Sequence, residues 1–433
     1  MRHRKRTTRV AALATLLLGG AALSGCSAAG GGDDVVQLEY WGWGVGQSEQ
    51  VALWNAANPD VQVRHTDAGG GTDSAAKLLT SSRAGNAPDV ALAEYTTIPS
   101  LVIADVPRDI TDLVADVDDA FTEGTWAQTT FGGQVYALPQ DAGPMVLTYR
   151  ADLLAETGQA VPTTWQEFGD VARAVHEQRP DTVLAAVPAG ELGFWAGVSA
   201  QAGADWWTVD ESGWTVGSAD ERMLEVADFF EGLAADGAID TDPVLSPEYN
   251  KRVNDGTIGG WAAGIWAPSV LGGVAPDTSG LWEISPLPEW IPGEAAVPFQ
   301  GGSALIVTKN SEHPEEAAAF AKWMNASTEG NQSLLDVRGV YPASIEGQAL
   351  AVGNPPPSLM PQQTEFYDVA ADVSEDVLPT TWGPNVALAT TTLTDELNAA
   401  ISAGTPWRDA FVATQAAVVA DMEQVGYQVT AND

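Results

Sequence analysis

The sequence of 433 residues has one cysteine, four histidines and only 19 basic residues, and each shortage excludes a class of function. A single cysteine leaves no partner for a disulfide within the chain. Beyond the N-terminal segment the histidines are His65, His176 and His313, too far apart for a metal-binding motif. The glycine-rich stretch Gly69–Thr72 lacks the lysine of a phosphate-binding loop. Because 58 acidic residues give a net charge of −39, the chain would repel nucleic acid. We therefore expect no metal, no cofactor and no nucleic-acid partner.

Long apolar runs are also scarce, and the one at the N-terminus, Val10–Leu23, follows five basic residues. A run of this length is too short to span a bilayer, which takes about 20 apolar residues, and is typical of a signal peptide. The string Leu23–Cys26 resembles a bacterial lipobox, in which the cysteine takes a diacylglycerol and becomes the mature N-terminus. We therefore predict a lipoprotein signal peptide over residues 1–25, a lipid anchor on Cys26, a flexible tether over 26–33, and a place on the extracytoplasmic face of the cell membrane. Cleavage by an ordinary signal peptidase at Ser27–Ala29 is the alternative.

The remaining chain has the composition of a folded protein. Removal of the first 25 residues takes away five basic residues and no acid, so the net charge falls to −44, while the hydrophobic fraction of 45% is ordinary. About 400 residues exceed what one hydrophobic core usually serves, so the length predicts two domains. Strand-like and helix-like segments alternate from Val35 to Ala93, which predicts an α/β fold with a parallel-type sheet. The expected segments are strands at 35–41, 61–66 and 89–93 and helices at 48–58 and 73–84.

Aromatic and polar residues follow the first and third of these strands. Trp41 and Trp43 end the first strand, and Glu94 and Tyr95 end the third. Ligands of α/β sheets collect beyond the carboxyl ends of the strands. An indole can stack on a sugar ring while carboxylates and amides bind the hydroxyls, so this pattern favours a sugar site. With 16 tryptophans in the chain, any one of them can equally be part of the core.

Four segments together resemble a known family, the extracellular solute-binding proteins of bacterial ABC importers, and in particular its carbohydrate-binding group. They occur in the family's order and cover the mature chain from 35 to about 425. They are Asn58–Val63 with Gly85–Val90; Gly133–Pro139 with Leu147–Leu154 and Pro162–Phe168; Gly256–Trp266; and Gly301–Val307 with Glu315–Trp323. The third departs from the family pattern, because Gly260 and Trp261 replace small residues.

The resemblance implies a periplasmic-binding-protein-like fold (type II) of two α/β lobes, joined by hinge crossings, with the ligand in the cleft between them. Carried onto this chain, lobe one comprises 34–142 and 297–340, lobe two comprises 143–296 and 341–425, and 426–433 form a C-terminal tail. The segment Gln140–Tyr149 is expected to be one hinge crossing. The family also implies a monomer that captures a carbohydrate and delivers it to ABC permease subunits, with a separate ATPase.

The ligand residues that the resemblance transfers come from both lobes. They are Trp41, Trp43, Glu94, Tyr95, Gln140, Asp141, Trp195, Trp266, Gly301, Gly302 and Trp382. The placement of Trp206 and Trp207 stays open, since Asp205–Trp214 looks like a surface hairpin. The loop after the third strand departs from that of maltose-type proteins, so the sugar's identity cannot be transferred.

Other residues are expected to be structural. Thr163 or Thr164 should cap the helix that contains Trp165, and Ala317, Phe320, Ala321 and Met324 share one face of a helix that contains Trp323. Both tryptophans are therefore assigned to packing rather than to the site.

Three other functions compete with sugar import. Glu94 and Asp141 could be the carboxylate pair of a glycosidase, although no nucleophile motif supports catalysis and we expect no enzyme. A surface adhesin or sensor could use the same fold without transport. The bound solute could also be something other than a sugar.

Overall fold

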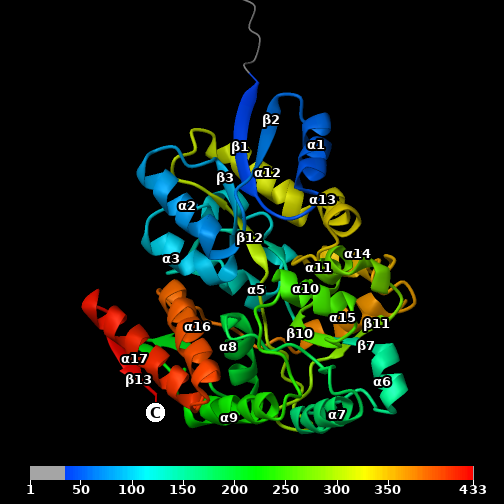
Figure 1. Ribbon diagram of the computed structural model, residues 1–433. Helices are drawn as coiled ribbons and strands as arrows, with labels where there is room; N and C mark the ends of the chain where they lie inside the picture. The colour runs from blue at the N-terminus through cyan, green and yellow to red at the C-terminus, as the bar shows by residue number, and fades with distance from the viewer. Residues whose placement is uncertain (1–34, 433) are drawn as a thin grey trace, which may run out of the picture. The chain divides into compact units, whose positions relative to one another are not determined.

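The computed structural model describes residues 35–432. The predicted signal peptide, tether and lipidated Cys26 lie outside the described residues. Within them, two sheets form the centres of two lobes, which are seen at the top and bottom of Figure 1. No helix of this part of the chain is both long and apolar enough to span a bilayer.

Lobe one is built on a five-stranded sheet in the order β2-β1-β3-β12-β6. Its strands are β1 (Val36–Gly42), β2 (Val61–Asp67), β3 (Val90–Glu94), β6 (Leu138–Asp141) and β12 (Ser303–Val307). The expected strands and helices of the first 100 residues are confirmed to within two residues. The sheet is mixed rather than parallel, because β12 runs antiparallel to β3 and β6. The chain enters β12 on its return from lobe two. An antiparallel strand can be reached in this way without the helical crossover that a parallel neighbour requires.

Helices cover both faces of this sheet, as Figure 1 shows with α2 and α3 on one side and α1 and α13 on the other. Side chains of β1 and β12 alternate between two cores, as a period of two requires. Leu38 and Tyr40 pack with Trp54 and Phe320 on one face, whereas Ala304 belongs to the core of the other face. The helices and short turns of this part are α1 (Gln47–Ala57), α2 (Gly71–Arg83), η1 (Tyr95–Thr97), α3 (Ile98–Ile103), α4 (Thr111–Val114), η2 (Asp118–Ala120), α5 (Glu123–Ala127), α12 (Pro314–Ala326), α13 (Thr328–Ser333), η4 (Leu334–Arg338) and the hairpin β4 (Thr130–Phe131) with β5 (Gln134–Val135).

Lobe two centres on a three-stranded antiparallel sheet in the order β10-β7-β11. Its strands are β7 (Met145–Arg150), β10 (Gly260–Gly264) and β11 (Trp282–Pro286). Edge-to-face aromatic pairs fill the adjoining helical layer: Trp195 lies 5.6 Å from Phe230 and 5.3 Å from Phe411 between ring centroids. Its other elements are α6 (Ala151–Thr157), α7 (Trp165–Gln178), α8 (Leu192–Gln201), β8 (Trp207–Asp210), β9 (Gly213–Val216), α9 (Glu221–Ala235), α10 (Pro247–Asn254), α11 (Ala267–Val274), η3 (Pro276–Thr278), α15 (Phe366–Glu375), α16 (Val386–Ala403), α17 (Arg408–Gln424) and β13 (Val429–Ala431).

The predicted lobe boundaries differ from the structure near the C-terminal half. Helix α14 (Ile345–Ala351) lies after residue 341 but packs on α13 of lobe one, and Ser344 bridges to Phe121. Within the expected C-terminal tail, β13 pairs in parallel with β9. The packing of α14 and the pairing of β13 are long-range contacts that local sequence patterns do not encode.

Predicted local structure is confirmed in two places. The Thr164 hydroxyl accepts a hydrogen bond from the Glu167 N–H, and the Glu167 carboxylate accepts one from the Thr163 N–H, so the helix begins with a reciprocal cap. The predicted apolar face of α12 is also buried. Trp165 belongs to the core as expected, and Trp323 is partly buried against Trp54.

Two extended segments cross between the lobes side by side, and a third extended segment pairs with the first of them. The Met145 N–H donates to the Pro298 carbonyl, the Gln300 N–H donates to the Gly143 carbonyl, and the Ala142 N–H donates to the Tyr341 carbonyl. The crossings are therefore residues 141–145 and 298–302, and the segment 340–342 pairs with the first crossing, which lies within the predicted hinge segment.

The first crossing packs so closely against its neighbour that an added side-chain carbon should destabilise the protein. A Cβ at Gly143 would lie 2.2 Å from the Gln300 carbonyl oxygen. We expect Gly143→Ala to lower the free energy of unfolding by about 1–3 kcal/mol, the usual range for overpacking, as measured by chemical denaturation. Gly232→Ala in α9, where nothing lies within 4 Å of the new Cβ, is the control and should be neutral or slightly stabilising. Equal effects of the two substitutions would contradict this account of the crossing.

Candidate ligand site

The predicted site residues gather where the crossing 298–302 enters lobe one. Glu94 is the last residue of β3 and pairs with Ser303 of β12, and the Tyr95 N–H donates to the Gly302 carbonyl at 3.3 Å. Gly301 and Gly302 have φ angles of 74° and 77°, in the left-handed region that favours glycine. A Cβ at Gly301 would lie 2.8 Å from the Trp266 indole nitrogen, so this backbone and that ring meet directly.

Trp266 approaches the crossing from lobe two. It precedes α11, and its indole N–H donates to the Gln300 carbonyl at 3.0 Å. Its ring packs edge-to-face on Trp261, with ring centroids 5.3 Å apart, and part of the ring stays exposed. Ser269 in the same helix donates to the Gly339 carbonyl of lobe one at 2.6 Å, so the two lobes touch on this side of the crossings.

Trp43 and Glu94 lie beside the N-terminus of α2. A Cβ at Gly70 would be 3.1 Å from the Trp43 ring, and one at Gly71 would be 3.6 Å from the Glu94 carboxylate. Trp41, Trp43 and Glu94 are partly exposed, whereas their neighbours in β3 are buried. These side chains can therefore face a ligand.

Glu191 is a residue that the sequence analysis missed. It lies in the turn before α8, and its carboxylate accepts a hydrogen bond from the Gln300 side chain at 3.1 Å. Nothing in the sequence around it marks a site, since it follows a Pro-Ala-Gly turn and precedes an apolar helix. Gln300 was missed as well, although it directly precedes the two predicted glycines.

Burial disfavours the charge on both glutamates. Burial and, next, the negative charge of Glu191 raise the pKa of Glu94 to about 7, and Asp141 adds a smaller effect. Burial also raises the pKa of Glu191, against the hydrogen bond from Gln300. The two carboxylates, one from each lobe, therefore interact with each other through their charges.

Three predicted residues are structural supports beneath this site. Tyr95 is 1% exposed, and its hydroxyl donates to the Asp141 carbonyl at 3.3 Å. The Asp141 carboxylate accepts from the Ser303 N–H at 3.1 Å and from its hydroxyl. Gln140 is fully buried and bonds Asn325 and Arg338. As the structure stands, these side chains hold the strand ends in place rather than face an open cleft.

The structure also removes two predicted tryptophans from the site. Trp195 has no exposed surface and is enclosed by the aromatic core of lobe two. Trp382 is 5% exposed and packs against Trp207, with ring centroids 6.2 Å apart. Both lie within two residues of a glycine in the sequence, a pattern that core and site share. The expected hairpin is formed by β8 and β9. Trp206 and Trp207 at its base are buried, so both side chains serve in packing.

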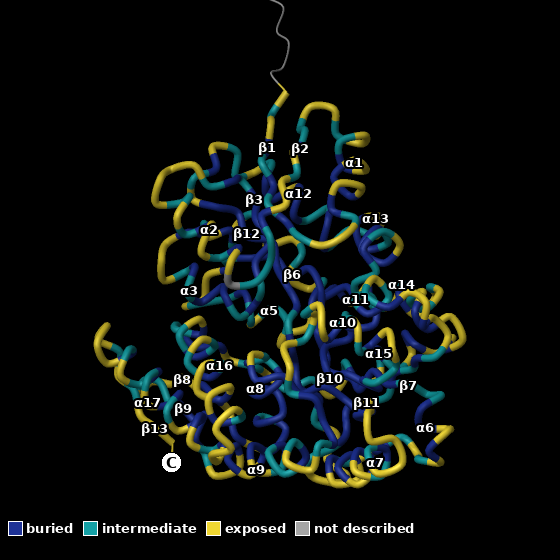
Figure 2. Tube along the Cα trace, in the orientation of Figure 1, coloured by how far each residue is buried: buried dark blue, intermediate teal, exposed yellow. Residues whose placement is uncertain are grey.

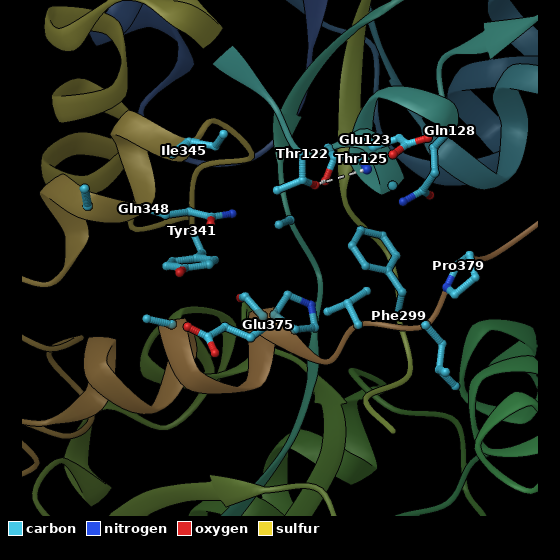
Figure 3. A pocket seen from close by; sticks show the side chains of 18 of the residues that line it. Thr122, Glu123, Thr125, Gln128, Phe299, Tyr341, Ile345, Gln348, Glu375 and Pro379 are labelled. Atoms are coloured by element: carbon cyan, nitrogen blue, oxygen red, sulfur yellow. Dashed lines mark hydrogen bonds between the residues drawn. The ribbon is translucent and has the colours of Figure 1, made fainter. Parts of the chain in front are cut away.

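A hollow of about 720 Å³ lies between the lobes on the opposite face of the crossings. Phe299 and Ala142 line it, whereas the next side chain, Gln300, points toward Glu191. Figure 3 shows Phe299 and Tyr341 between the side chains at the start of α5, among them Thr122 and Glu123, and those of α15. None of the eleven predicted ligand residues lines this hollow. Figure 2 shows that the strands between the two lobes are mostly buried.

The fold and this site define a class of protein: two α/β lobes joined by extended crossings, with partly exposed indoles and carboxylates of both lobes at the junction. Residues 32–330 match the model of the bacterial extracellular solute-binding protein family. The chain belongs to this family, and it is a binding protein rather than an enzyme.

Individual relatives agree with this assignment. The arabinooligosaccharide-binding protein of Halalkalibacterium halodurans is 26% identical over 272 residues, which are 61% of this chain and 60% of that protein. The match thus spans less than two thirds of the relative's length. An uncharacterized lipoprotein of Streptomyces antibioticus is 34% identical over 181 residues, 39% of each chain. Among solved structures, the ABC transporter associated binding protein of B. animalis subsp. lactis, in complex with β-1,6-galactobiose, is 25% identical, with a TM-score of 0.83 over 92% of this chain and 100% of that chain.

The raised pKa of Glu94 predicts a pH-dependent effect on stability. Between pH 4.5 and about 7 the folded protein keeps a proton that the unfolded chain has released, so the contribution of Glu94 to stability falls as the pH rises through this window. We expect Glu94→Gln to raise the melting temperature by about 2 °C or more at pH 8, and to change it little at pH 4.5.

Glu167→Gln is the contrasting control. Hydrogen bonds from Thr163 lower the pKa of the Glu167 carboxyl, so its stabilising contribution is present at high pH and is lost as the pH falls. This substitution should therefore lower the melting temperature at pH 8. Melting curves at the two pH values check both variants, and a Glu94→Gln variant that melts below the wild type at pH 8 would contradict the burial of an unpaired charge.

Proposed function

We propose that the protein captures an oligosaccharide at the junction of the two lobes and delivers it to an ABC permease. The observation that carries this proposal is the meeting of the Trp266 ring, the Glu94 and Glu191 carboxylates and the Gly301 backbone at one crossing segment. An indole offers a flat apolar surface to a sugar ring, and carboxylates accept hydrogen bonds from its hydroxyls. Arabinooligosaccharide and β-1,6-galactobiose, which the names of the relatives mention, are the first sugars to test.

The ligand set that we propose for this chain is a subset of the predicted one with Glu191 and Gln300 added. It comprises Trp41, Trp43, Glu94, Glu191, Trp266, Gln300 and Gly301. Closure of the lobes around the ligand would follow from preferential binding to the closed form. Opening from the present arrangement requires loss of the Ser269 contact with Gly339.

Calorimetric titration with a panel of neutral oligosaccharides tests the site. We expect saturable binding that Trp266→Ala weakens about tenfold or more, because loss of one stacking surface removes at least 1.4 kcal/mol. Trp323→Ala on α12 removes a partly buried indole that packs on Trp54 and is not in the proposed ligand set, so it is the control. A wild-type protein that binds no sugar but binds peptides or other solutes would overturn the proposal.

We also propose that the mature protein is anchored to the membrane through a lipid on Cys26. Support comes from the Leu23–Cys26 string and from the Streptomyces antibioticus relative, which is named a lipoprotein. Cys26→Ser should move the protein from the membrane fraction to the medium and abolish incorporation of labelled palmitate. Unchanged membrane association of this variant would exclude the anchor. Sugar binding by the released protein should be the same, since residues 35–432 form one compact unit without it.

A further inference from the structure

The junction of the lobes carries two acids without a base to pair with them. Glu94 enters from β3 of lobe one and Glu191 from the start of α8 in lobe two. They lie at the two ends of one short segment, since Glu191 accepts from the Gln300 side chain and Glu94 is paired with Ser303 in the sheet. Within residues 35–432, neither carboxylate forms a salt bridge.

The basic groups near the junction are directed elsewhere. Arg338 is 8% exposed and donates to Gln140 and to the Trp43 carbonyl, and its charge acts on Asp141 and Tyr40. Lys77 donates to the Ala68 carbonyl. The charged groups around the crossing are therefore three acids, Glu94, Glu191 and Asp141, and two bases, Arg338 and Lys77, neither of which forms a salt bridge with either glutamate.

We propose that this site selects against negatively charged sugars, and that Glu191, which is hydrogen-bonded to one end of the segment whose other end pairs with Glu94, is a specificity-determining residue for neutral ligands. The inference rests on the proposed function. An ionised carboxylate can only accept hydrogen bonds, so it suits the hydroxyls of a neutral sugar and offers nothing to another carboxylate. A third carboxylate within a few ångströms of both glutamates, in a partly buried site, would be repelled by each of them.

The test compares a neutral oligosaccharide that binds with the same sugar oxidised at a primary hydroxyl to the uronic acid. Both are titrated into the wild-type protein by calorimetry at pH 7.5 and low salt. We expect the uronic acid to bind roughly a hundredfold more weakly, the effect of one like charge about 6 Å away at intermediate dielectric. At pH 5.5 the difference between the two affinities should narrow, because Glu94, whose pKa burial raises to about 7, takes up a proton while the carboxyl of the ligand stays ionised.

Glu191→Gln tests the assigned residue through the ratio of the two affinities. We expect this ratio to fall about tenfold, whatever happens to the affinity for the neutral sugar itself. Glu375→Gln, the same charge change at an exposed residue that lines the hollow behind the crossings, should leave the ratio unchanged. Glu94→Gln is the second variant should Glu191→Gln fail to fold, as judged by its melting curve.

The outcomes separate this inference from the proposed function. Equal binding of the neutral and the acidic sugar by the wild type would overturn the inference and leave sugar capture standing. A wild type that rejects the acid while Glu191→Gln keeps the same ratio would overturn the role of Glu191. A wild-type protein that binds none of the sugars would overturn both the inference and the proposed function.

Discussion

Gln300 is the residue on which the arrangement of the two lobes depends. It is 3% exposed, and each of its polar groups is hydrogen-bonded. Its N–H donates to the Gly143 carbonyl of the neighbouring crossing, and its carbonyl accepts from the Trp266 indole. Its side-chain amide accepts from the Gly264 N–H and donates to Glu191. One buried side chain therefore positions the end of β10, the aromatic ring and a carboxylate of the site, and a buried polar network of this kind is stable only when it is complete.

The crossings also determine where the molecule can move. Their mutual hydrogen bonds persist if the lobes rotate, because the bonds run between crossing segments rather than between lobe surfaces. On the ligand side the lobes touch through Ser269 and Gly339, whereas on the other face a hollow separates α5 from α15. Few packed side chains on that face resist a change in the angle between the lobes. A hinge of this kind can couple capture of a ligand to closure without rearrangement of either hydrophobic core.

Local sequence patterns predicted the parts of this molecule that depend on neighbouring residues. The first strands and helices, the reciprocal cap at Thr164 and the buried face of α12 all follow from periodicity and capping chemistry. The antiparallel entry of β12, the packing of α14 on lobe one and the pairing of β13 with β9 depend on contacts between residues far apart in the sequence. The same distinction applies to the site. Glu94 and Trp43 could be predicted from the sequence because they follow strands. Glu191 could not, because it joins the site only through its hydrogen bond with Gln300, more than a hundred residues later in the chain.

The tryptophans show why composition alone could not separate site from core. Trp195 and Trp266 both lie near glycine in apolar segments of the sequence. Trp195 is enclosed by aromatic rings, whereas the Trp266 indole contacts the backbone of Gln300. The two side chains differ in the hydrogen bonding of their indole nitrogens. That of Trp195 is buried without a hydrogen-bond partner among the described residues, so this ring contributes through packing alone. That of Trp266 is bonded to the Gln300 carbonyl, which fixes the plane of the ring beside Gly301 and leaves part of its surface exposed. An aromatic surface whose orientation is already fixed loses little conformational entropy when a ligand stacks on it, which favours Trp266 over the more numerous buried indoles as the residue that contacts the ligand.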